Sequence, residues 1–72
     1  MTIYKFDYDC KIKHEGYSDY FSCEFEEEFE DDFAAVGYAF LRAALYEELG
    51  IKVTSIYVYE KLHCENVLLN IG

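Results

Sequence analysis

The chain has 72 residues, of which fifteen are acidic and six are lysine or arginine, so its formal net charge at pH 7 is -9. A field of this sign repels nucleic acid and anionic membrane surfaces and attracts cationic partners, which points to a basic protein surface as the target. Apolar residues make up 53% of the chain and include eight tyrosines and six phenylalanines. Such a composition excludes a disordered protein, because disordered chains combine charge with few aromatic residues.

The length predicts a single domain over residues 1–72, with a thin core, because a chain this short buries only about 60% of its unfolded surface. No apolar run approaches the roughly 20 residues of a membrane span. The N-terminus lacks a basic region followed by an apolar segment, so no secretory signal is expected. The cysteines Cys10, Cys23 and Cys64 are odd in number and show no CxxC spacing, which suits free thiols in a reducing compartment. We expect a cytoplasmic protein.

The first two segments predict a hairpin. Residues 3–13 alternate apolar and polar side chains, and residues 20–26 resume the alternation after a loop, so each reads as a half-buried strand. A tight turn with Gly16 at its first central position pairs Cys10 with Cys23. A register shifted by two residues brings the same apolar faces together, so the sequence does not exclude it. In the first register, Asp7 lies opposite Glu26 and Asp9 opposite Glu24, two like-charge pairs that destabilise the sheet.

A long helix is predicted from Asp31 and Asp32, acids at its N-terminus, to Gly50, a left-handed cap. Its main apolar stripe is expected at Ala34, Gly37, Tyr38, Leu41, Leu45 and Leu49. Further apolar residues continue around the helix, although a helix on one face of a sheet is normally polar on its far side. This remainder predicts a self-association surface, most simply a two-fold dimer, formed by Val36, Phe40, Ala43 and Tyr46.

The rest of the chain predicts two more strands, residues 52–62 and about 66–71, with Tyr57 and Tyr59 on the outer face. The element order is then ββαββ. A right-handed crossover carries the helix over the first strand and gives the strand order 2-1-3-4. The fold class is therefore α+β, with two layers: a four-stranded antiparallel sheet and one helix packed on one face.

The most informative segment is residues 24–32, where seven of nine residues are acidic and Phe25 and Phe29 stand between them. Solvated acidic tails contain few large aromatic residues, so this segment is expected to be folded and to hold its charges at fixed positions. Exposed tyrosines beside carboxylates can seat arginine and lysine. The plainer alternatives are a solvated charged face and ordinary strand-forming tyrosines. The predicted partner-binding residues are Asp7, Asp9, Tyr20, Glu24, Glu26, Glu27, Glu28, Glu30, Asp31, Asp32, Tyr57 and Tyr59.

No catalytic, cofactor or metal site is predicted. The sequence contains no GxSxG, P-loop or HExxH motif, and scattered cysteines and histidines do not identify a catalytic dyad. Cys10, Cys23, His14 and the pair at residues 63–64 lack the local spacing of a zinc site. We therefore expect a binding protein that is not an enzyme.

In size, charge and element order the chain resembles small acidic proteins of phages and mobile elements, in particular anti-CRISPR proteins, several of which mimic DNA. The resemblance rests on the two strands, the acidic run from Glu24 to Asp32, and a helix closing on residues 47–50. It implies stoichiometric inhibition of a nucleic-acid-binding complex in the host cytoplasm, by occupation of a lysine- and arginine-rich groove. The alternative is an oligomeric structural or antitoxin-like protein that self-associates through its apolar helix.

Overall fold

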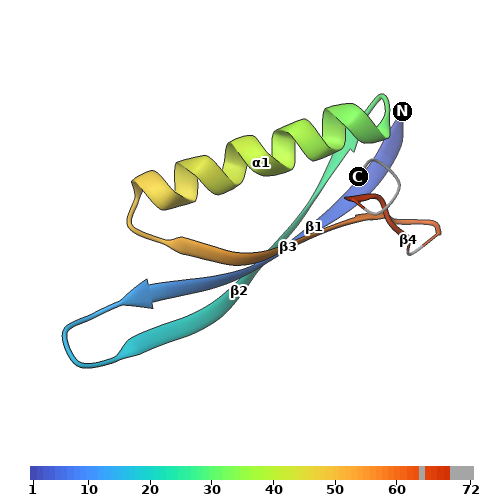
Figure 1. Cartoon of the computed structure of the whole chain (residues 1–72). Coiled ribbons are helices and arrows are strands. Elements are labelled where there is room, and N and C mark those ends of the chain that lie inside the picture. The colour runs from blue at the N-terminus through green and yellow to red at the C-terminus, as the bar shows by residue number, and fades with distance from the viewer. Residues whose placement is uncertain (64, 69–72) are drawn as a thin grey trace.

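The computed structural model, which describes residues 1–63 and 65–68, is a sheet with a single helix lying along one face (Figure 1). The sheet order is β2-β1-β3-β4, and each neighbouring pair is antiparallel. This confirms the predicted α+β class and strand order. The elements are β1 (Thr2–Lys13), β2 (Ser18–Phe29), α1 (Asp32–Glu48), β3 (Lys52–Glu60) and β4 (Glu65–Asn66).

The core lies between α1 and the three longer strands. Alternation along β1 sends four large or apolar side chains inward, and Tyr4, Phe6, Tyr8 and Cys10 are all buried. The hydroxyl of Tyr8 crosses the core and donates to the carbonyl oxygen of Ala39 at 2.8 Å. Phe6 stacks on Phe25 of β2 with ring centroids 4.8 Å apart. Aromatic rings from the sheet therefore fill most of the space between the layers.

Both ends of α1 form as the sequence predicts. The carboxylate of Asp31 accepts a hydrogen bond from the backbone N–H of Ala34 at 2.9 Å, which satisfies one of the free donors of the first turn. Gly50 has a φ of 85°, in the left-handed region that favours glycine. The N–H of Ile51 then donates to the carbonyl of Tyr46 at 2.9 Å, and Ile51 packs against the core.

The predicted register of the hairpin is wrong by two residues. The observed register pairs Cys10 with Phe21 and Tyr8 with Cys23, and the two strands are joined by residues 14–17 instead of a two-residue turn. The N–H of His14 donates to the carbonyl of Tyr17 at 2.8 Å, and Gly16 takes a φ of 84°. Because the shift is an even number, every apolar face is preserved.

The predicted orientation of the helix is also wrong. The buried residues of α1 are Ala35, Val36 and Ala39, whereas Leu41 and Leu45 of the predicted core stripe are exposed. The rings of β1 occupy the interlayer space, so the residues that approach them are mostly alanines. The larger leucines are left on the outside.

At the C-terminal end, β3 ends at Glu60, close to the predicted boundary, and β4 is a two-residue strand. The predicted strand at 66–71 extends into residues 69–72, which lie outside the described residues, as does Cys64. Val67 is buried, and its N–H donates to the carbonyl of Val58 at 2.8 Å. Among residues 1–63 and 65–68, no helix is both long and apolar enough to cross a membrane.

Candidate functional site

The outer sheet face, turned away from α1, carries one row of side chains from each long strand. The observed register places the charged rows of β1 and β2 side by side and the tyrosines of β3 next to β1. The face contains most of the predicted binding residues. Its central members are Lys5, Asp7 and Asp9 from β1, Tyr20, Ser22, Glu24, Glu26 and Glu28 from β2, and Tyr57 and Tyr59 from β3.

Two of the predicted acids on this face are matched by lysines. Lys5 Nζ lies 3.5 Å from a carboxylate oxygen of Glu24, and Lys61 Nζ lies 2.8 Å from Glu26. Neither lysine was among the predicted binding residues. Lys5 could have been included, because it occupies the same outward row as Asp7 and Asp9. Lys61 follows β3 and reaches Glu26 only through the tertiary fold.

The aspartates of β1 are in different environments. Asp9 lies opposite Ser22, not opposite Glu24 as predicted, and it accepts a hydrogen bond from the Ser22 hydroxyl at 3.1 Å. Asp7 lies between Glu24 and Tyr57, and its buried Oδ1 has no hydrogen-bond partner among the described residues. Burial raises the pKa of Asp7, and the nearby charges of Glu24 and Asp9 add to that increase, against an opposing effect of Lys5. Neither predicted like-charge pair is therefore present, but the shifted register creates a different one, Asp7 opposite Glu24.

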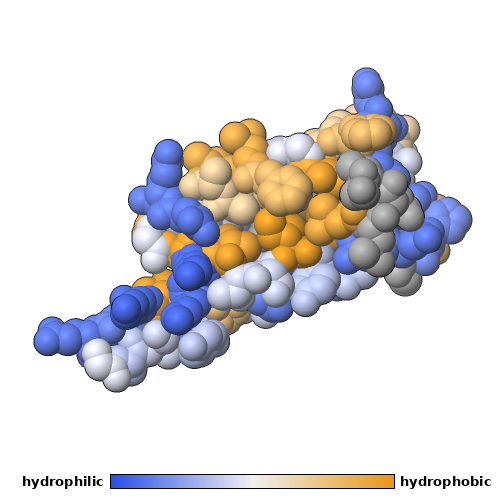
Figure 2. Space-filling model, in the orientation of Figure 1, coloured by the Kyte–Doolittle hydropathy of each residue, from blue (hydrophilic) through white to orange (hydrophobic). Residues whose placement is uncertain are grey.

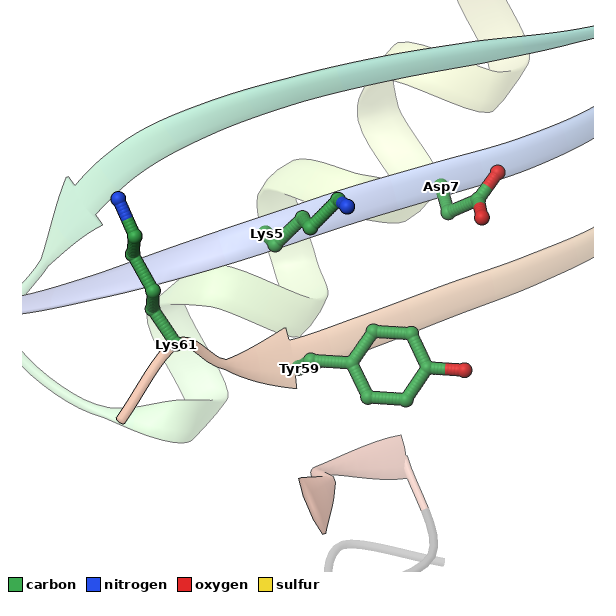
Figure 3. A pocket seen from close by; sticks show the side chains of 4 residues that line it. All are labelled: Lys5, Asp7, Tyr59 and Lys61. Carbon is green, nitrogen blue, oxygen red and sulfur yellow. The ribbon is translucent and has the colours of Figure 1, made fainter. Parts of the chain in front are cut away.

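Two stacked tyrosines of β3 lie beside Asp7 on this face. The rings of Tyr57 and Tyr59 stack 6.3 Å apart at an interplanar angle of 8°. Tyr59 also lines a hollow of about 260 Å³ together with Lys5, Asp7 and Lys61 (Figure 3). A carboxylate next to an aromatic face can hold a guanidinium or ammonium group, since the ring and the carboxylate both attract the cation.

The acids that follow on β2 and in the turn to α1 form what we call the acidic edge: Glu27, Glu28, Glu30 and Asp31. All four side chains are exposed, and within the described part of the chain none makes an ion pair. Glu27 and Glu28 point to opposite faces of β2, which is the outermost strand of the sheet, so charge wraps around its edge. With Ile3 and Glu26 they line an open depression of about 590 Å³.

Two of the predicted acids have structural roles. Asp31 caps α1, as described above. Asp32, the first residue of the helix, accepts a hydrogen bond from the Tyr4 hydroxyl at 2.7 Å. Burial and this hydrogen bond both raise the pKa of Tyr4, so its hydroxyl stays a donor at neutral pH. Tyr20, the remaining predicted tyrosine, is 72% exposed, and the Lys11 ammonium lies 5.8 Å from its ring.

Neither the sequence nor the fold of this chain has a match among the known proteins that were compared. No family model, curated protein or solved structure matches this chain. The resemblance to anti-CRISPR and DNA-mimic proteins therefore stays a prediction.

Within residues 1–63 and 65–68, no cluster of histidine, cysteine and acidic side chains is arranged to hold a metal ion. Burial raises the pKa of the Cys10 thiol to about 11, so this thiol is protonated and unreactive at neutral pH.

The predicted self-association surface does not exist in the form expected. Of its four residues, Val36 is buried, Ala43 and Tyr46 pack against the core, and only Phe40 is exposed, at 56%. The reason is the same rotation of α1 that exposes the leucines.

Proposed function

We propose that this chain is a binding protein, not an enzyme, that docks its acidic edge and outer sheet face on a basic, nucleic-acid-binding surface of a protein partner. The observation that carries the proposal is the acidic edge, where Glu27, Glu28 and Glu30 are exposed at the rim of the sheet and make no ion pair with any of the described residues. Lysines and arginines of a partner can supply these missing charges.

The placement of the acids on a strand supports this function over simple solubility. β2 is held along its whole length by β1, so its carboxylates have fixed spacing. Alternate residues such as Glu24, Glu26 and Glu28 follow each other at roughly 6.8 Å along a strand. Because the backbone of this row is already ordered, binding has to order only the side chains, and the row offers a basic groove a substitute for a phosphate backbone.

Asp7 and the stacked tyrosines extend the same surface. The Asp7 carboxylate lacks a hydrogen-bond partner for its buried oxygen among the described residues, and Tyr57 and Tyr59 stand beside it. An arginine placed here would gain a charge-assisted hydrogen bond and a ring contact together. We infer that the partner is blocked by occupation of its basic groove, as in inhibitors of the anti-CRISPR or DNA-mimic type acting in a host cytoplasm.

The proposal is tested by capture and competition. The chain is immobilised, exposed to bacterial lysate, and washed with either duplex DNA or a neutral polysaccharide at the same ionic strength. We expect retained proteins to be nucleic-acid-binding proteins that duplex DNA releases and the polysaccharide does not. Retained proteins that duplex DNA leaves in place would contradict a shared groove, and so would an absence of nucleic-acid-binding proteins among them.

A further inference from the structure

The outward side of α1 is apolar, although no part of the described chain covers it. We call this surface the outer helix strip: Phe33, Gly37, Phe40, Leu41, Ala44 and Leu45. All six residues are exposed, with Phe33 at 72%, Leu41 at 58% and Leu45 at 50%. Figure 2 shows apolar side chains along the helical layer and below it toward the sheet, with hydrophilic residues at both ends of the molecule.

No charged group interrupts the strip. Arg42 is the single charged residue between Asp32 and Glu47, and it turns toward the sheet. Its guanidinium carbon lies 4.1 Å from the ring centre of Phe25, and its nitrogens donate to the hydroxyls of Tyr38 and Tyr46 at 2.8 and 3.1 Å. A partner of the strip therefore has to be recognised by apolar shape and not by charge.

Gly37 gives a second, independent observation. Glycine in a helix interior is destabilising relative to alanine, so it is usually found where a neighbouring group approaches the helix too closely for a side chain. Within the chain there is no such need, because a Cβ added at Gly37 would meet nothing within 4 Å. A glycine on the outer side of a helix allows the backbone of a second helix to come close. The monomer does not explain this residue, whereas a neighbouring helix does.

We propose that the strip binds a second copy of this chain, with the two α1 helices packed antiparallel about a two-fold axis near Leu41. Gly37, Leu41 and Leu45 are spaced by four residues and form one ridge, the kind that packs into the matching groove of another helix. In this arrangement Leu45 of each copy lies opposite Gly37 of the other. The strip thus contains both a bulky side chain and the space that receives it, as a two-fold interface requires.

The exposed apolar area of the strip is a substantial part of what such a dimer needs. Taking about 200 Å² for a whole phenylalanine side chain, Phe33 and Phe40 alone expose roughly 250 Å². The surface continues from Phe40 into a groove of about 380 Å³ between α1 and β3, lined in part by Val53 and Ile56. A stable interface buries about 800 Å² from each partner, so the two rings alone supply roughly a third of that area, and the half-exposed Leu41 and Leu45 add to it. Small domains commonly supplement a thin core in this way.

The dimer is tested on the full chain by sedimentation equilibrium from low to high micromolar concentration, at several salt concentrations. We expect a monomer–dimer equilibrium that strengthens with salt, because salt screens the repulsion between two chains of the same net charge. Leu41→Glu, which brings two carboxylates together at the axis, should weaken association at least 100-fold. Leu62→Glu is the matched control, since Leu62 is 87% exposed in the turn after β3 and is not part of the strip, and should leave association unchanged.

Gly37→Leu probes the space itself. It should weaken the dimer at least tenfold while the circular dichroism spectrum stays that of the wild type, since none of the described residues comes within 4 Å of a Cβ at this position. A wild-type chain that remains monomeric at the highest concentration would overturn the proposal. Equal association of the Leu41 and Leu62 variants would do the same. Neither result bears on the acidic edge, so this inference stands or falls separately from the proposed function.

Discussion

The two solvent-facing layers of this molecule share one core and have opposite surface chemistry. The outer sheet face is charged, and two of its acids are tied to Lys5 and Lys61 by ion pairs. The outer helix strip has no charge, because Arg42 is folded inward onto aromatic rings. Under the two proposals, the layers therefore bind partners of different chemistry. Electrostatic docking on the sheet weakens with salt, whereas apolar association of helices between like-charged chains strengthens with salt.

The largest expected effect is a loss of stability on removing a ring from the shared core, compared with removing one from the outer helix strip. Phe6 is fully buried and stacks on Phe25, so Phe6→Ala should lower the free energy of unfolding by about 3–5 kcal/mol and disable both faces. Phe40→Ala removes the same ring from the strip and should lower the stability of the monomer by only about 1–2 kcal/mol, because 56% of Phe40 is already exposed. Urea unfolding at a concentration where the chain is monomeric measures both. Equal losses would mean that Phe40 belongs to the core.

A smaller effect is expected at Arg42, which keeps the helix side free of charge. Arg42→Met retains the apolar stem but loses two hydrogen bonds and the ring contact, so stability should fall by about 1–3 kcal/mol. Arg42→Lys is the informative control, because an ammonium cannot reproduce the planar fork that reaches both hydroxyls, and it should recover only part of the loss. Full recovery by lysine would show that charge alone matters at this position.

On the sheet side, Asp7→Asn should raise the melting temperature at pH 7. The pKa of Asp7 is raised in the folded protein above its ordinary value of 3.8, so the ionised form opposes folding. That penalty is present at a pH above the folded pKa and disappears as the pH falls below 3.8. The gain in the asparagine variant should therefore shrink as the pH decreases. A gain that is independent of pH would show that ionisation is not its cause.

The sequence predicted the layers correctly because alternation and capping are local signals. The alternation of β1 and the cap residues Asp31 and Gly50 sufficed for the strand faces and the helix ends. The hairpin register could not be predicted, since Gly16 can take a positive φ in either loop and an even shift leaves the same residue types facing inward.

The orientation of the helix depended on a tertiary property. α1 is apolar around most of its circumference, so its periodicity does not select a buried side. The choice is made by β1, whose tyrosines and phenylalanine occupy the space that leucines of the helix would need. The acidic edge was predictable as a segment, but which acids of β2 are ion-paired was not, because Lys61 reaches Glu26 only through the tertiary fold.

The central claim, that the acidic edge is the docking surface, is tested most directly by two variants of equal net charge. One carries Glu27→Lys, Glu28→Lys and Glu30→Lys, and the other carries Glu15→Lys, Asp19→Lys and Glu47→Lys, which replace exposed acids away from the edge. Binding of both to the captured partner is measured by surface plasmon resonance at 0.15 M salt. We predict that the first variant loses binding and that the second keeps most of it. Equal binding by the two variants would show that only net charge is recognised and would contradict the account.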